Sequence, residues 1–265
     1  MKINISRDAR PQVRTLLIAT AITLVLWFIP YADMLTYPFR IFVTFIHEGG
    51  HAMAALLTGN SVRSLSVAVD GSGLTYTSTQ GIFSKIIVSS AGYLGATAYG
   101  ALLLVLIRRA VAARWVLIGS AAFILVMTLI YGLWSPLTSG LSGSLFGIPF
   151  TLLAGLALSL ALIATALYAS PRTATFFVSF LAVQCVLNAL LDLKTIFLTT
   201  VPGADDVPSD AANMANATGI PAMFWAVIWI GLSFLLLSMA MRFYAISRHQ
   251  KATQQDLPFE EPLEV

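Results

Sequence analysis

Apolar runs of about 20 residues recur along this chain, and they constrain its fold more than any other feature. They can be placed near 15–35, 39–58, 86–107, 115–134, 145–168, 174–198 and 222–246. A bilayer offers no water to satisfy backbone groups, so segments of this length cross it as helices. Only 10% of the 265 residues are charged, against about 25% in soluble domains. We therefore predict an all-α protein that crosses the membrane several times, with six or seven helices (about seven).

The second run, 39–58, is interrupted by the motif H-E-G-G-H, which extends from His47 to His51. On a helix, side chains four residues apart share a face, so both imidazoles can reach one zinc ion. Glu48 follows the first histidine, where H-E-x-x-H metalloproteases place their general base. Ionisable groups at the centre of a span cost about 2.5–3.5 kcal/mol each, which favours metal binding over a hydrogen-bonded polar cluster.

Small residues on the second and third runs predict that these two helices pack closely. Gly49 and Gly50 lie inside the second run, where each glycine costs about 1 kcal/mol relative to alanine unless the space is needed. In the third run, Gly92, Ala96 and Gly100 recur at the four-residue spacing that lets membrane helices approach. We expect this face to lie against the helix that carries His47.

Between these runs, residues 60–80 have the pattern of a short β-hairpin. Leu65 and Val67 alternate with polar residues, Asp70 and Gly71 supply a turn, and the alternation resumes towards Tyr76. An isolated hairpin is marginal in water, so we expect it to lean on the helices; an exposed loop is the alternative.

The sixth run, 174–198, carries a second polar stripe. Asn188, Asp192 and Thr195 fall on one helical face, which makes Asp192 a candidate third metal ligand and Asn188 a group that orients it or binds substrate. The alternatives are a hydrogen-bonded contact between helices and an ion pair with Lys194. The rival ligands are three acids of the following loop: Asp205, Asp206 and Asp210.

That loop also contains a signal for a short helix, which Ser209 or Asp210 would cap and which Gly219 and Pro221 would end. We expect residues 1–248 to form a single membrane domain. Residues 249–265 are polar and are predicted to be a disordered tail.

Charge and cysteine content exclude other classes of protein. The net charge is +3, but the basic residues are spread over the ends of the runs, so nucleic acid is not an expected partner. The single cysteine, Cys185, lies inside a run, which excludes a disulfide framework and a cysteine-based zinc site.

Basic residues also bear on orientation. Four of them precede the first run: Lys2, Arg7, Arg10 and Arg14. They predict a cytoplasmic N-terminus in a cell membrane. With seven crossings, Arg108, Arg109 and Arg114 would fall on the opposite side, so this bias would nearly cancel.

With H-E-x-x-H in a span, a hairpin after it and a late Asn/Asp span, the chain resembles the site-2 protease family of intramembrane zinc metallopeptidases, in its short bacterial branch. The resemblance covers 41–100 closely and 188–195 more thinly. By this resemblance His47 and His51 match the histidine ligands, Glu48 the catalytic glutamate and Asp192 the late aspartate. The family usually has Gly after that aspartate, where this chain has Leu193.

The resemblance implies a zinc endopeptidase with Zn²⁺ as cofactor, the lipid bilayer as its surroundings and a membrane-spanning protein as its substrate. Two alternatives come from other classes. A catalytically silent pseudoprotease would bind membrane helices without cutting them, although an intact Glu48 argues against it. A metal or proton transporter would need a continuous polar path, whereas polar stripes occur on two runs only.

Overall fold

The structure is a computed structural model, and it describes residues 10–26, 29, 31–108, 112–139, 147–199 and 209–245. The predicted tail 249–265, the loop acids Asp205 and Asp206, and the side chains of Lys194 and Thr195 lie outside the described part.

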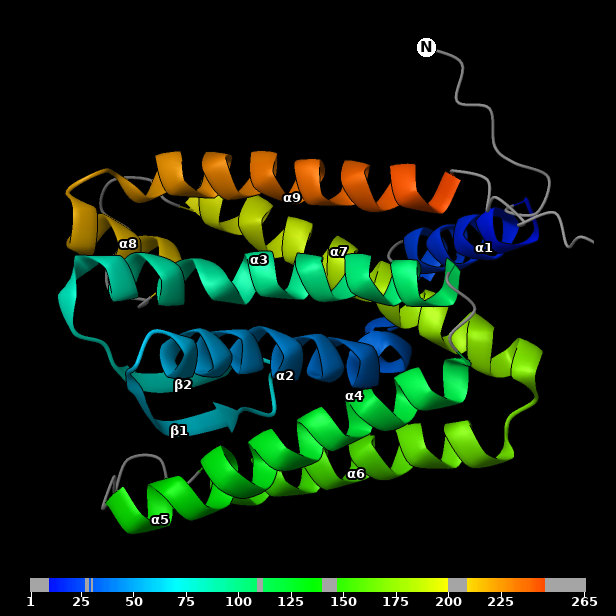
Figure 1. The fold of residues 1–265 in the computed structure, drawn as a ribbon, viewed down its shortest axis with the longest axis horizontal. Helices are drawn as coiled ribbons and strands as arrows, with labels where there is room; N and C mark the ends of the chain where they lie inside the picture. Colours follow the sequence, from blue (N-terminus) through cyan, green and yellow to red (C-terminus); the bar gives the residue numbers. More distant parts are fainter. Residues whose placement is uncertain are drawn as a thin grey trace, which may run out of the picture.

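Long helices and one hairpin make up the described chain (Figure 1). In chain order they are α1 (Arg10–Leu26), α2 (Asp33–Leu57), β1 (Ser61–Val67), β2 (Gly73–Ser78), α3 (Gly81–Arg108), α4 (Ala113–Met127), the π-helix η2 (Thr128–Trp134), α5 (Ser135–Ser139), α6 (Ile148–Tyr168), α7 (Pro171–Thr199), α8 (Asp210–Thr218) and α9 (Ala222–Ala245). α4, η2 and α5 follow one another without a break, so they act as one long rod. The helical fold and the hairpin agree with the prediction from sequence.

Among the described residues, five helices are long and apolar enough to cross a membrane. They are Gly81–Ile107, Ala113–Thr138, Ile148–Tyr168, Pro171–Asp192 and Ala222–Arg242. The expected count of six or seven spans is therefore not confirmed. The apolar part of α1 is limited to Leu16–Leu26, and α2 carries charged and imidazole side chains within its length.

α2 lies at the centre of the bundle, packed against α3, the hairpin and α7 (Figure 1). Phe42 and Phe45 are almost wholly buried, and Ala52 and Ala55 are closed off from solvent. A helix packed against protein on several sides need not present an apolar surface, so α2 can carry the polar motif that the five long apolar helices lack.

Close approach of α2 and α3 explains the glycines of the motif. A Cβ added at Gly50 would collide with the backbone carbonyl of Ala91, and one at Gly49 would lie 2.6 Å from Phe123 Cζ on α4. Gly95 lies against Gly50 in turn. The predicted packing of α3 on α2 is therefore confirmed around Gly92 and Gly95. Gly100, farther along α3, packs on α7 instead.

The hairpin pairs β1 with β2 as antiparallel strands, from Ser61 opposite Ser78 to Val67 opposite Gly73. The Asp70 carboxylate accepts hydrogen bonds from the amide and hydroxyl of Ser72 and closes the turn. α2 holds this turn in place, because the Tyr37 hydroxyl donates to the Val69 carbonyl at 2.6 Å.

β1 also bonds to the bundle. Thr151 Oγ1 on α6 accepts a hydrogen bond from the Val67 amide at 2.9 Å, and Ser135 Oγ donates to the Arg63 carbonyl at 2.7 Å. Leu65 and Val67 are buried, as the alternation predicted, and Val62 is buried as well, on the other side of a register shift between Val62 and Ser64. The hairpin therefore packs against the helices through β1. One edge of β2 pairs with β1, and no further strand pairs with its other edge among the described residues.

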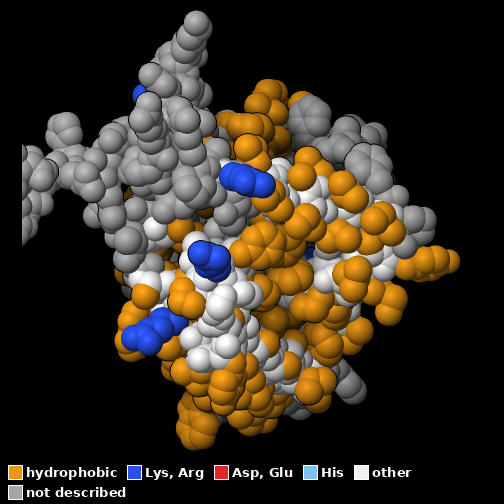
Figure 2. Space-filling view, turned by 90° about the vertical axis from the view of Figure 1, so that its right-hand side faces the viewer, with side chains coloured by type: hydrophobic (Ala, Val, Ile, Leu, Met, Phe, Trp, Pro, Cys, Tyr) orange, Lys and Arg blue, Asp and Glu red, His pale blue; other side chains and the backbone are white. Residues whose placement is uncertain are grey.

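Basic side chains gather at one end of the molecule. Figure 2 looks onto the end where α4 and α7 begin, where α9 ends and beside which α1 lies. The described part of this face shows Lys and Arg on an apolar surface and no Asp or Glu. Exposed arginines near these helix ends are Arg14, Arg114, Arg172 and Arg242. Arg14 and Arg114, which the sequence placed on opposite sides, thus lie at the same end. Other exposed basic side chains lie on α2, on the hairpin and at the start of α3, and these are Arg40, Arg63 and Lys85.

Candidate metal centre

His47 and His51 lie one turn apart on α2 and turn their imidazoles towards the same point. Their Nε2 atoms are 3.1 Å apart, and Nδ1 of His51 bonds the carbonyl oxygen of Val88 on α3 at 2.6 Å. A carbonyl only accepts, so His51 Nδ1 carries a proton, and Nε2 is the nitrogen that faces His47 and Asp210. This is how a metal-ligating histidine is oriented by the partner of its other nitrogen.

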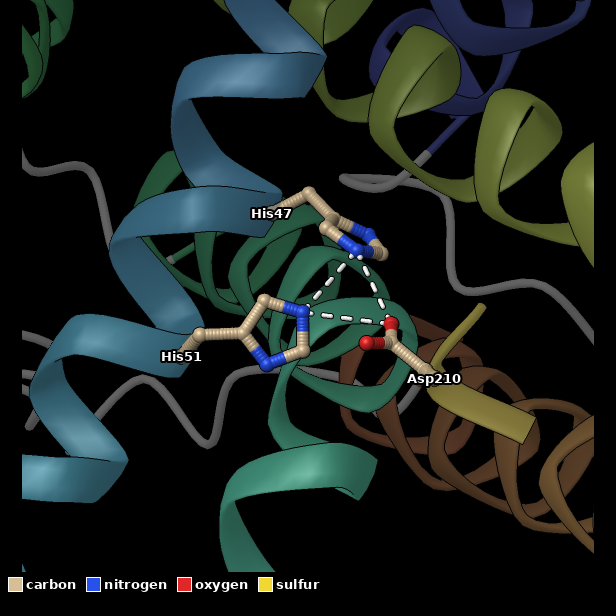
Figure 3. Close-up of side chains that lie close together, drawn as sticks. All are labelled: His47, His51 and Asp210. Atoms are coloured by element: carbon tan, nitrogen blue, oxygen red, sulfur yellow. Dashed lines mark hydrogen bonds and ion pairs between the residues drawn. The ribbon is translucent and has the colours of Figure 1, made fainter. Parts of the chain in front are cut away.

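Asp210 completes the group (Figure 3). Its Oδ2 atom lies 3.2 Å from His47 Nε2 and 3.1 Å from His51 Nε2, so the three atoms form a nearly equilateral triangle. Zinc bonds of about 2.0–2.1 Å in tetrahedral geometry place ligand atoms roughly 3.3 Å apart. Two imidazoles and one carboxylate on such a triangle therefore fit a zinc ion and leave a fourth position for water.

Asp210 is the first residue of α8, and local sequence explains its position. Ser209 caps the helix by accepting a hydrogen bond from the Ala212 amide at 3.1 Å, and Gly219 ends it in the left-handed conformation with φ 75°. Both helix signals predicted from sequence are confirmed. The positive end of the helix dipole favours a carboxylate at this place.

The charge state of Asp210 suits a metal ligand. Burial alone raises the pKa of its carboxyl, but the imidazoles of His51 and His47 outweigh burial and hold that pKa well below its usual range. A carboxylate must be ionised to bind a metal ion, and the lowered pKa of Asp210 favours that form.

Glu48 is buried beside the triangle and is held by the hairpin. Thr75 Oγ1 on β2 donates to Glu48 Oε2 at 2.6 Å. Gly73, two residues earlier on the same face of the strand, leaves room for the carboxylate, since a Cβ there would lie 2.6 Å from Glu48 Cγ. The strand that follows the motif in sequence thus orients its acid.

Tyr93 and Gly92 on α3 close the other side of the histidines. The Tyr93 ring meets the His47 ring edge to face, with centroids 4.6 Å apart, and rests on Trp229 of α9. Trp229 is itself anchored, because its Nε1 donates to Ser90 Oγ at 3.1 Å. A Cβ added at Gly92 would collide with Nε2 of both histidines, so only glycine leaves space at this point.

The structure does not bring Asp192 into this group. Asp192 lies on α7 within electrostatic range of His47, but the cluster whose ligand atoms lie within 4.8 Å of one another contains Asp210 in its place. The physical reason is that α8 folds back onto α3 and α9 and returns a loop acid to the bundle. Asp192 as third ligand stays a prediction, with Asp210 better placed among the described residues.

Asn188, the other described residue of the predicted polar stripe of α7, has a structural role. Asn188 donates to the carbonyl and side-chain oxygen of Gln184, whose own amide donates to Thr23 Oγ1 on α1 at 2.9 Å. The bonds of Asn188 thus stay within α7, and Gln184 makes the contact between α7 and α1. The predicted role of Asn188 beside the metal has no described contact to support it.

A cavity of about 630 Å³ adjoins the triangle. Its lining includes the motif residues of α2, the strand β2, the first half of α3 and the polar face of α8. Glu48 and the candidate ligands therefore face a shared space within a bundle of apolar helices, large enough for a peptide segment.

Sequence reasoning missed Thr75 and ranked Asp210 among the rivals. For Thr75, the strand alternation places its side chain on the same face as Gly73. The sequence around Thr75 does not indicate that this face packs against Glu48. For Asp210 the signal was the cap at Ser209, followed by polar residues every third position on α8.

Comparison with known protein families identifies the family of this chain. The family described as Peptidase M50B-like matches residues 16–240. No curated protein and no solved structure matches the chain.

Proposed function

Because this chain belongs to the Peptidase M50B-like family, the site-2 protease family that its sequence resembles, we propose that it is an intramembrane zinc metalloprotease that hydrolyses peptide bonds of membrane-embedded proteins. The observation that carries the proposal is the triangle of His47, His51 and Asp210 with Glu48 beside it. Zinc at such a site would activate water near neutral pH and polarise the scissile carbonyl.

Glu48 is the proposed general base. Its Oε2 atom holds the hydrogen bond from Thr75, which leaves Oε1 to take a proton from the attacking water and pass it to the leaving amine nitrogen. The Thr75 bond keeps the carboxylate aimed while the proton moves.

Asp210 is proposed as the third protein ligand, in preference to Asp192. The two histidines come from one helix, so they need a third group from another element to complete one face of a tetrahedron. The N-terminal turn of α8 provides it, 3.1–3.2 Å from both nitrogens.

The proposed substrate is a membrane-spanning segment that has lost its helical hydrogen bonds locally. A peptide carbonyl inside a helix is shielded, so the segment must be extended to be cut. β2 lines the cavity next to Glu48, and its edge away from β1 can bind the extended segment as an added strand.

The proposed location is the cell membrane, with the basic end of the molecule in the cytoplasm. The gathering of arginines on the face shown in Figure 2 supports this orientation by the positive-inside tendency. The N-terminus would then be cytoplasmic.

The test compares purified wild type with Glu48→Gln in detergent and in liposomes, measuring zinc content and cleavage of a transmembrane peptide. Glu48→Gln should keep the metal and lose about 10²–10⁴-fold in turnover. Asp70→Asn makes the same chemical change in the exposed hairpin turn and should stay active.

Zinc-loaded wild type that cuts no membrane peptide would refute the protease and favour a protein that binds membrane helices without cutting them. Loss of zinc in Glu48→Gln would show that Glu48 is a ligand.

A further inference from the structure

The cavity beside the metal site is walled by two elements of different kinds. Residues 73–77 all line it, and because successive strand residues point to opposite faces, a consecutive run can do so only if the strand turns its edge to the cavity. The other edge of β2 is paired with β1. The second wall is α8, which contributes Asn213, Asn216 and Ala217 to the lining.

α8 turns two amide side chains into this cavity. Ala211 and Met214 are buried against Tyr93 and Trp229, which orients the opposite face of the helix outward. That face carries Asn213 and Asn216, one turn apart; their side chains are exposed, line the cavity and make no hydrogen bond to another described residue.

An extended peptide bound to β2 uses only one of its own edges. The N–H and C=O groups of its other edge stay unpaired unless side chains of the opposite cavity wall bind them, and a backbone polar group left without a partner is costly where water is scarce. Groups on one edge of a strand repeat every two residues, about 6.6–6.8 Å apart. Side chains three apart on a helix have Cβ atoms about 5–6 Å apart, and a carboxamide offers both a donor and an acceptor.

We propose that Asn213 and Asn216 bind the backbone of the substrate segment on the side away from β2, so that the segment lies between a strand edge and a pair of amides. This inference rests on the proposed proteolytic function and extends it. Asp210 begins the same helix one turn earlier, so the metal ligand and the two amides form one rigid unit. Recognition through the backbone selects an extended conformation and tolerates different side chains.

The experiment measures binding apart from cleavage. Zinc-loaded Glu48→Gln is reconstituted in phosphatidylglycerol–phosphatidylcholine vesicles with a labelled peptide of about 20 apolar residues that contains a central Asn-Gly-Ser-Gly stretch. Asn213→Leu and Asn216→Leu remove the amides at nearly constant size. Each should weaken binding about fivefold and the double variant roughly twenty-five-fold, the loss expected for one and two net hydrogen bonds.

Ala212→Leu on α8 is the matched control, since Ala212 does not line the cavity, and it should bind like the parent. All variants should keep stoichiometric zinc. In the active enzyme the double variant should raise KM more than it lowers kcat. Asn216→Gln keeps a carboxamide, so it should bind the peptide more tightly than Asn216→Leu does.

Unchanged affinity in the double variant, or no binding of the peptide to the parent, would overturn the inference. Loss of zinc together with affinity would also overturn it, because α8 would then have a structural role only. If the variants weaken binding as expected while wild type cuts nothing, the inference stands and the proposed hydrolysis fails.

Discussion

Gly92→Ala is the sharpest test of the metal centre. The change adds one methyl group on α3, where it would collide with Nε2 of both His47 and His51 and lie 2.5 Å from His47 Cε1. Carbon atoms in contact prefer about 3.5–4.0 Å, so the imidazoles would have to move by about 1 Å. Metal sites tolerate distance changes of about 0.2 Å.

We therefore expect zinc affinity to fall at least about 100-fold, at the upper end of what disturbing ligand orientation costs. Folding should suffer less than zinc binding, because alanine is favoured over glycine inside a helix by about 1 kcal/mol, which offsets part of the local strain. The assay is zinc content and affinity by competition with a chelator, read beside thermal unfolding of the apo protein.

Gly95→Ala is the matched control on the same helix. Its new Cβ would meet Gly50 Cα at 3.5 Å, an ordinary contact, so zinc affinity should stay within about twofold of wild type. Wild-type zinc affinity in Gly92→Ala would refute the reasoning, since the imidazoles would then not lie against α3 as the structure has them.

Other predictions follow from the same geometry. Asp210→Ala should weaken zinc at least about tenfold while Asp192→Ala binds like wild type, measured by the same competition; the reverse result would make Asp192 the ligand. Thr75→Val should keep zinc but lower kcat about tenfold, because Glu48 loses the bond that aims it, and an unchanged kcat would contradict this role. Gly50→Leu should separate α2 from α3 and abolish activity, and an active variant would show a roomier contact than the collision with Ala91 implies.

Sequence alone determined most of the elements of this protein and two of its three candidate metal ligands. Helix positions follow from the length and spacing of apolar runs, and the hairpin follows from alternation around Asp70 and Gly71. His47 and His51 meet because a helix repeats every 3.6 residues, whatever surrounds it. Such relations act over a few residues, so they can be derived without knowing the packing.

The tertiary structure decided which distant groups join them. Asp192 and Asp210 are both acids near the end of a helix, and only the return of α8 onto α3 brings one of them within 3.2 Å of the imidazoles. Thr75 reaches Glu48 because the hairpin docks on α2. Asn188 bonds to Gln184, which in turn bonds to Thr23 on α1, so Asn188 serves helix packing and makes no described contact to the metal centre. These choices depend on which helices pack together, and packing is a property of the whole chain that no short pattern contains.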